Sequence, residues 1–288
     1  MCCRPRQFKL AIASWNSSTM VLRYLVFSLH LPNTLRSEMS RNDDRSTVNV
    51  KVPQVVDRET WQAQVDALLI IEKGHTREGD AIAAARRRLP MVEVDANLKL
   101  VGANGPVTLL DTFEGRRQLV AYYHMFFPGE PAAEQCEGCT FFNGQVRELA
   151  YLNARGITYA TFCWGPYDES VRYRDFMGWD VPWYSVADSA DILRAGRPFN
   201  KFFLACYLRD EDRVFETYWT RGRGIEAMSP TMGIMDKTVY GRQEDWENSP
   251  SGWPQSDIMS SLRSNGRPKA QWPRIEAGRS DDLGPARR

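Results

Sequence analysis

The chain lacks several features that would place it in the larger classes of binding protein. Its 37 basic and 36 acidic residues leave a formal net charge of +1, without the basic excess typical of nucleic-acid-binding proteins. No apolar run reaches the roughly 18 residues that a spanning helix needs, because the stretch 20–31 is interrupted by Arg23. We therefore expect a protein that binds neither nucleic acid nor a membrane.

Cysteine and histidine are also scarce. Six cysteines in 288 residues are too few and too irregularly spaced for a small secreted disulfide scaffold, which favours a reducing, cytoplasmic location. A closed structural zinc site needs four ligands, usually a second cysteine pair or two histidines at close spacing, and the three histidines here are far apart. We expect no bound cofactor.

One pair of cysteines does have a spacing with chemical meaning, Cys136-Glu-Gly-Cys139. It lies between a strongly apolar run, residues 119–127, and a helical pattern that begins near Thr140. A strand, a Cys-x-x-Cys motif and a helix in this order present a redox dithiol at the start of a helix, where amide groups favour the thiolate. We expect Cys136 to be the attacking thiolate and Cys139 to resolve the mixed disulfide.

His124 lies within the apolar run 119–127 that leads to this motif. It could lower the pKa of the attacking thiol or move a proton, whereas a structural histidine would simply donate to a backbone carbonyl. A non-catalytic alternative is a soft metal ion, such as Cu(I) or zinc, held by Cys136, Cys139 and His124.

Further side chains are weaker candidates, each with a structural alternative. Cysteines in later strands are more simply small core residues. Arginines after the last hairpin could stabilise a thiolate or bind an anion, although solvated loop charges explain them too. Tryptophans near the motif could line a groove or the core. The cysteines are Cys163 and Cys206, the arginines are Arg221, Arg223 and Arg242, and the tryptophans are Trp164, Trp179 and Trp183.

The pattern of apolar and turn-forming residues predicts an α/β fold with a central mixed sheet flanked by helices. We expect helices over 58–88, 140–155, from Asp168 to Gly178, and from Asp188 to Arg194. Strands are expected over 91–95, 98–101, 107–110, 119–127, 157–164, 183–187, 202–208 and 214–219. A strand-helix-strand unit, then a helix, then a two-stranded hairpin is the thioredoxin plan.

Composition divides the chain into four parts. Residues 1–38 contain no acidic residue before Glu38, and Met39 begins an ordinary polar stretch, so 1–52 is expected to be disordered or a mis-assigned extension. An N-terminal helical segment over 53–90 and a thioredoxin-like domain over 91–247 follow. Residues 248–288, rich in Ser, Pro, Gly, Arg and Asp, are expected to form a disordered tail.

Six stretches together resemble the thioredoxin-like family catalogued as domain of unknown function 899. They are Trp61 to Lys73, Arg86-Arg-Arg-Leu-Pro-Met-Val92, Tyr122-Tyr-His-Met-Phe-Phe127, Cys136-Glu-Gly-Cys139, Met177-Gly-Trp-Asp-Val-Pro-Trp183 and Tyr240-Gly-Arg-Gln-Glu244. The resemblance implies a thioredoxin-like fold, with an N-terminal helical extension. By analogy of fold it implies thiol-disulfide oxidoreductase activity with an unknown thiol or disulfide substrate and an external reductant.

Two departures qualify what the resemblance implies. The connection into the last hairpin is short, and Pro198 is the candidate for a cis-proline beside the dithiol. The Pro-x-x-x-Thr/Ser-x-x-Cys pattern of peroxiredoxins is absent because Ala133 stands three residues before Cys136, which argues against a peroxidase.

Overall fold

The computed structural model describes residues 51–197 and 202–285. The expectations for residues 1–50, including a start at Met39, and for Pro198 lie outside the described residues. Helix α1 (Arg58–Arg86) begins where the Asp57 carboxylate accepts the Thr60 amide at 2.7 Å. None of its residues is buried, and its outer contacts include a 2.7 Å ion pair between Glu72 and Lys237. The predicted N-terminal helix is therefore present.

Eight strands form one mixed sheet in the order β1-β8-β7-β4-β5-β6-β2-β3. Strands β4, β5 and β6 are parallel to one another, and every other pairing in the sheet is antiparallel. The strands are β1 (Val92–Val94), β2 (Lys99–Gly102), β3 (Gly105–Thr108), β4 (Gln118–His124), β5 (Ile157–Cys163), β6 (Trp183–Ser185), β7 (Phe203–Asp210) and β8 (Arg213–Thr220). All eight predicted strands are found: β1, β4, β5 and β6 are one or two residues shorter than expected, β2 and β3 have the expected length, and β7 and β8 are longer.

Strand β4 is the central element because both of its faces are buried. Leu119, Ala121 and Tyr123 point to one side and pack with residues of β5 and β7, whereas Tyr122 packs on the other side with the two cysteines of the motif. Alternate residues of a strand face opposite sides of the sheet, so a strand buried on both faces is apolar at nearly every position. That is why the run was recognisable in the sequence.

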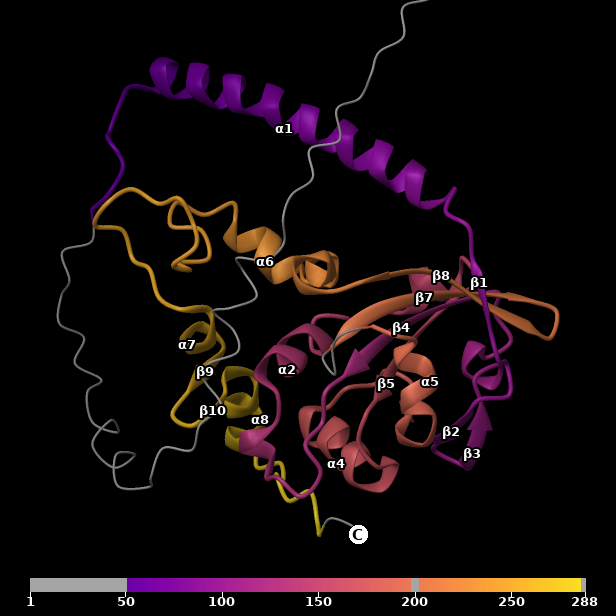
Figure 1. Ribbon diagram of the computed structural model, residues 1–288. Helices are drawn as coiled ribbons and strands as arrows, with labels where there is room; N and C mark the ends of the chain where they lie inside the picture. The colour runs from indigo at the N-terminus through magenta and orange to yellow at the C-terminus, as the bar shows by residue number, and fades with distance from the viewer. Residues whose placement is uncertain (1–50, 198–201, 286–288) are drawn as a thin grey trace, which may run out of the picture. The chain divides into compact units, whose positions relative to one another are not determined.

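Helices lie on both faces of the sheet (Figure 1). Residues of α2 (Glu137–Asn143) and α4 (Tyr167–Met177) share a core with Tyr122, while Leu193 of α5 (Ala190–Arg194) packs on the opposite face. The unit β4-α2-β5, then α4, then the β7-β8 hairpin is the thioredoxin plan. The predicted fold class, thioredoxin-like α/β, is confirmed.

The predicted helix over 140–155 is wrong in its continuity. It is divided into α2 and a single turn, α3 (Ala150–Asn153), with Gly144 closing the first piece. A Cβ atom at Gly144 would lie 3.2 Å from the Thr140 carbonyl oxygen and 3.6 Å from Nε1 of Trp179. Trp179 lies at ordinary van der Waals distance from this position, and helical periodicity does not reveal such a tertiary contact.

The two later predicted helices begin within two residues of Asp168 and Asp188, but neither aspartate is the N-cap. Pro166 is the N-cap of α4, and Asp168 lies in its first turn, where a carboxylate is favourable to the helix dipole. Asp188 lies in the 3-10 turn Ala187–Ser189 that precedes α5. The predicted end of α4 is right, because Gly178 has a φ of 67°, in the left-handed region that glycine accepts without strain.

The expectation of a disordered tail from residue 248 does not hold for the described residues. The chain after β8 forms a 3-10 helix (Gly222–Met228), α6 (Pro230–Met235), α7 (Ile258–Leu262), β9 (Arg263–Ser264), β10 (Arg267–Pro268) and α8 (Trp272–Glu276). Gln271 is fully buried and donates to the Ala132 carbonyl oxygen at 2.7 Å. Leu283 joins the core on the side of α2. A few widely spaced buried residues, such as Gln271 and Leu283, attach this segment to the core. Their spacing gives no periodic pattern of apolar residues in the sequence.

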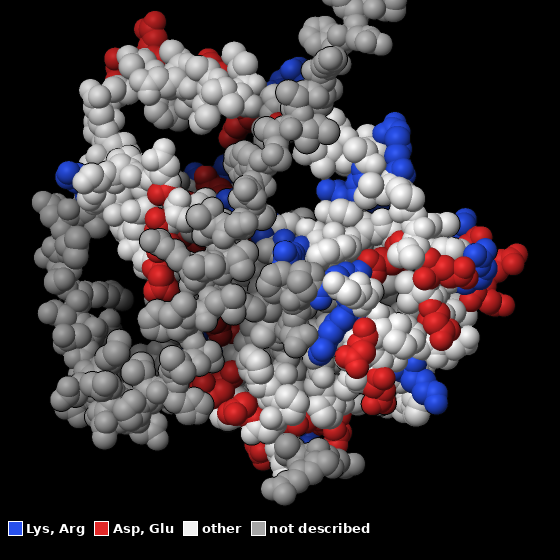
Figure 2. Space-filling model, viewed as in Figure 1, with Lys and Arg blue, Asp and Glu red and all other residues white. Residues whose placement is uncertain are grey.

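The charged surface agrees with the balanced composition. On the face in Figure 2, Lys and Arg side chains lie beside Asp and Glu over much of the described surface. None of the helices in the described part of the chain is both long and apolar enough to span a membrane.

Tyr123 and Tyr207 provide a test of the core. Their hydroxyls share a 2.6 Å hydrogen bond between β4 and β7, and both side chains are buried. Tyr207→Phe leaves the Tyr123 hydroxyl without a partner, so it should lower the free energy of unfolding by about 1–3 kcal/mol. Removing both hydroxyls should recover most of that loss. Urea unfolding measures both effects, with the exposed Tyr151→Phe as the control; a double variant less stable than the single one would contradict this account.

Candidate functional site

The two cysteines of the motif lie at the beginning of α2, where β4 has just ended. Cys136 is the N-cap residue, and its Sγ accepts the backbone N–H of Cys139 at 3.3 Å. Sγ of Cys139 accepts the Met125 amide at 3.2 Å, which ties the second cysteine to the end of the central strand. Both thiols are free, and Cys136 retains 8% exposure whereas Cys139 has none.

The environment displaces the pKa values of the two thiols in opposite directions. The hydrogen bond from the Cys139 thiol lowers the pKa of Cys136, and the Cys139 amide adds to this effect against the opposing effect of burial. Burial raises the pKa of Cys139, and a negative charge on Cys136 raises it further. The thiolate of the pair is therefore carried by Cys136, the more exposed sulfur.

A buried polar network holds the backbone beneath Cys136. The Thr140 hydroxyl donates to the Cys136 carbonyl oxygen at 2.7 Å and lies 2.5 Å from the hydroxyl of Tyr173. Gln271 donates to that same tyrosine oxygen at 2.9 Å. Side chains from α2, α4 and the C-terminal segment thus fix the first turn of the dithiol helix.

His124 lies on the same face of the sheet as the dithiol. It is fully buried among the rings of Tyr122, Tyr173, Trp179 and Trp183, with centroid distances from 5.1 to 6.2 Å. Burial lowers its pKa to about 3, so the imidazole is neutral at physiological pH and supplies no positive charge to Cys136. Neither ring nitrogen has a hydrogen-bond partner among the described residues, so the expected donation to a carbonyl is not seen either.

The tryptophans and the other two cysteines named from the sequence have surroundings that give them structural roles. Trp179 and Trp183 stack at 5.9 Å inside the core, and Trp164 lies beneath Arg194. Burial raises the pKa of Cys163 to about 12 and that of Cys206 to about 11, which makes both thiols unreactive. In the described part of the chain no three His, Cys, Asp or Glu side chains are grouped as metal ligands.

Two of the arginines after the hairpin, Arg223 and Arg242, belong to ion pairs rather than to the dithiol. Arg242 is bound by Asp236 at 2.7 Å and by Glu226 at 2.9 Å, and Arg223 pairs with Glu226 at 3.0 Å.

Sequence reasoning missed three residues that shape the site. Tyr122 was part of a matching stretch, but its role on the dithiol face depends on strand direction; burial and the nearby thiols raise its pKa. Thr140 could have been suspected from its position in the first turn after the motif. No signal pointed to Gln271, which is 132 positions after Cys139 and reaches the site only through the fold.

The β4-α2-β5 unit, α4 and the β7-β8 hairpin follow the thioredoxin plan, and the two cysteines lie at the start of the helix after the central strand. These features define a thioredoxin-like protein. The chain belongs to the family described as "Bacterial protein of unknown function (DUF899)", which it matches over residues 50–265. The family expected from the sequence is confirmed. The curated proteins include no match to this chain.

Solved structures with a similar arrangement are distant in sequence. Thioredoxin from Wuchereria bancrofti is 16% identical over 48% of this chain and 90% of its own, with a TM-score of 0.34. Peroxiredoxin Q from Xanthomonas campestris is 14% identical over 48% and 92%, with a TM-score of 0.33. A secreted disulfide oxidoreductase from Mycobacterium tuberculosis, described as homologous to DsbE, is 13% identical over 47% and 93%, with a TM-score of 0.31.

Burial of a neutral His124 predicts a particular pH dependence of stability. Its pKa falls from 6.5 in the unfolded chain to about 3 in the folded protein, so the unfolded state binds the extra proton between these values. The stabilising contribution is complete above the unfolded pKa and is lost as the pH falls. Between about pH 6 and 4.5 the wild type should lose about 2 kcal/mol more than His124→Phe does.

Denaturant unfolding over this pH range measures the difference. The control is His75→Gln, since His75 is exposed on α1 and its removal should leave the pH dependence unchanged. Parallel curves for the wild type and His124→Phe would show that His124 can be protonated in the folded protein.

Proposed function

We propose that this protein is a thiol-disulfide oxidoreductase that acts through Cys136 and Cys139. The observation that carries the proposal is the placement of the Cys-x-x-Cys pair at the start of α2, where the Cys139 amide donates to Sγ of Cys136. The opposite displacement of the two thiol pKa values supports it. A thiolate is the nucleophile in thiol-disulfide exchange, and a buried neighbouring thiol is suited to the second step. The substrate is a thiol or disulfide compound, and the small cysteine content supports work in a reducing, cytoplasmic setting.

In the reducing direction the Cys136 thiolate attacks one sulfur of a substrate disulfide. A bond forms between Cys136 and that sulfur, the substrate S–S bond breaks, and the other substrate sulfur leaves as a thiolate. Cys139 then loses its proton, attacks Sγ of Cys136 and releases the second substrate thiolate. The substrate gains two electrons, with one proton that Cys139 gives up and one taken from water, and the protein is left with a Cys136–Cys139 disulfide, which an external dithiol reduces by the same exchange.

The contacts of Cys139 suit this order of events. In the resting dithiol its proton is retained, because burial and the charge on Cys136 oppose a second thiolate. Once Cys136 is in a mixed disulfide, its negative charge and its hydrogen bond with the Cys139 thiol are gone, so burial is the main remaining cause of the raised Cys139 pKa. The Met125 amide then remains as a donor to the developing Cys139 thiolate. The neutral His124 can contribute only through its uncharged imidazole.

Exchange with a chromogenic aromatic disulfide tests the proposed roles. Cys136→Ser should abolish the fast reaction, whereas Cys139→Ser should still react once and accumulate the mixed disulfide, because the resolving thiol is missing. Cys206→Ser is the matched control and should behave as the wild type. A Cys136→Ser variant that still reacts at the wild-type rate would remove the basis of the proposal.

The equilibrium test uses alkylation and mass spectrometry of the intact protein across a series of glutathione redox ratios. Cys136 and Cys139 should change state together, since they form one two-electron couple. The pH midpoint for alkylation of Cys136 should lie below that of an ordinary cysteine, as the direction of its pKa displacement requires. Independent oxidation of the two cysteines, or none under strongly oxidising conditions, would contradict the proposal.

A further inference from the structure

A cavity of about 400 Å³ lies between the dithiol helix and the C-terminal segment. Glu137, Thr140 and Phe141 of α2 form one wall, and residues of α6, the 242–244 turn and the 261–270 region form the others. Its size is within the range of small-molecule sites. Neither Cys136 nor Cys139 lines it, so the cavity is separate from the dithiol.

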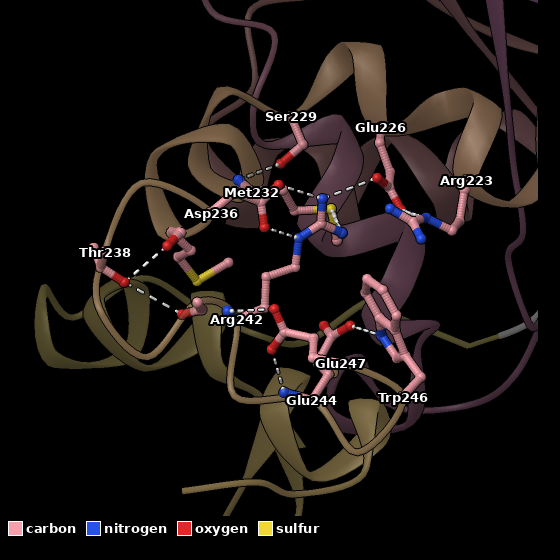
Figure 3. A network of polar contacts seen from close by, with 12 residues as sticks. Arg223, Glu226, Ser229, Met232, Asp236, Thr238, Arg242, Glu244, Trp246 and Glu247 are labelled. Carbon is pink, nitrogen blue, oxygen red and sulfur yellow. Dashed lines mark hydrogen bonds and ion pairs between the residues drawn. The ribbon is translucent and has the colours of Figure 1, made fainter. Parts of the chain in front are cut away.

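Two of the charged residues of the lining already have partners. Arg242 is nearly buried and lies between Asp236 and Glu226, as Figure 3 shows, with a further contact from Nη1 to the sulfur of Met232. Glu137 pairs with Arg263 at 2.9 Å. These charges are neutralised by the protein, so they leave little demand for a charged ligand.

The other two charges of the lining have no such neutralisation. The carboxylate of Glu244 is only 3% exposed and accepts the indole N–H of Trp246, but it forms no ion pair with a described residue. Lys269 is exposed and likewise has no carboxylate partner in the described part of the chain. A buried charge is costly unless it is paired, so Glu244 calls for a cation inside the cavity.

The remaining lining is largely apolar. Its larger apolar side chains are Phe141, Met232, Met235 and Leu262. A ligand that satisfies the whole cavity therefore has an apolar body, a cationic group for Glu244 and an anionic group for the exposed Lys269.

We propose that this cavity binds a small zwitterion with an apolar body, in the manner of a short apolar peptide with free ends. The ammonium group pairs with Glu244, the carboxylate pairs with Lys269, and the side chains lie against Phe141 and the two methionines of α6. The assignment rests on the cavity and its charges, and it holds whether or not the dithiol is redox-active.

Isothermal titration calorimetry of the full, reduced protein with the dipeptide leucyl-leucine tests the site. Two modified peptides separate the two ends: N-acetyl-leucyl-leucine lacks the ammonium, and leucyl-leucine amide lacks the carboxylate. Acetylation should weaken binding by about tenfold or more, because a charge-assisted contact in a buried site is lost. Amidation should weaken it less, since Lys269 is solvated.

Variants of the protein give the matching evidence. Glu244→Gln should weaken leucyl-leucine binding as much as acetylation does, and it should no longer distinguish the acetylated peptide from the free one. Glu276→Gln, an exposed carboxylate on α8 outside the cavity, is the control and should bind as the wild type. Cys136→Ser should also bind normally, which separates this site from the dithiol chemistry.

The peptide comparison uses only the wild type, so it decides the matter even if Glu244→Gln folds poorly. No binding of leucyl-leucine up to about 10 mM, or equal binding of the free and acetylated peptides, would overturn the proposal. Equal affinity of a folded Glu244→Gln variant and the wild type would overturn it as well.

Discussion

The pairing of β4 between β5 and β7 is the interaction on which the rest of the structure depends. Because both faces of β4 are buried, its alternate residues organise two separate cores, one around Tyr123 and one around Tyr122. The chain leaves the strand at a fixed point, where the Met125 amide contacts the sulfur of Cys139. The end of the central strand thus helps to position the dithiol, together with the polar network under Cys136.

The dithiol shows how burial and hydrogen bonding compete at two adjacent sulfurs. Burial opposes the thiolate of both cysteines, but Cys136 also receives the Cys139 amide and thiol, which outweigh it. Cys139 has only the weaker compensation of the Met125 amide and Tyr122. One helix turn therefore contains one thiol with a lowered pKa and one with a raised pKa. Burial also decides the state of His124. Its imidazole is desolvated among aromatic rings and has no carboxylate partner among the described residues, so it stays neutral.

The C-terminal segment adds to the thioredoxin plan by packing against the dithiol helix. Gln271 reaches the network under Cys136, and Arg263 pairs with Glu137 on the dithiol helix. The Arg242 network with Asp236 and Glu226 holds the turn before this segment in place. The cavity beside α2 lies where these pieces meet, and Glu244 in its lining forms no ion pair with any described residue.

Local patterns in the sequence determined most of the elements. The apolar run 119–127 identified the central strand, and Cys136-Glu-Gly-Cys139 identified the start of the dithiol helix, because strand burial and motif spacing are encoded by neighbouring residues. The break at Gly144, the neutral state of His124, the role of Gln271 and the ordered C-terminal segment were decided by the tertiary structure. Each depends on which distant side chains come into contact, and on the desolvation that results, and neither quantity is contained in a short stretch of sequence.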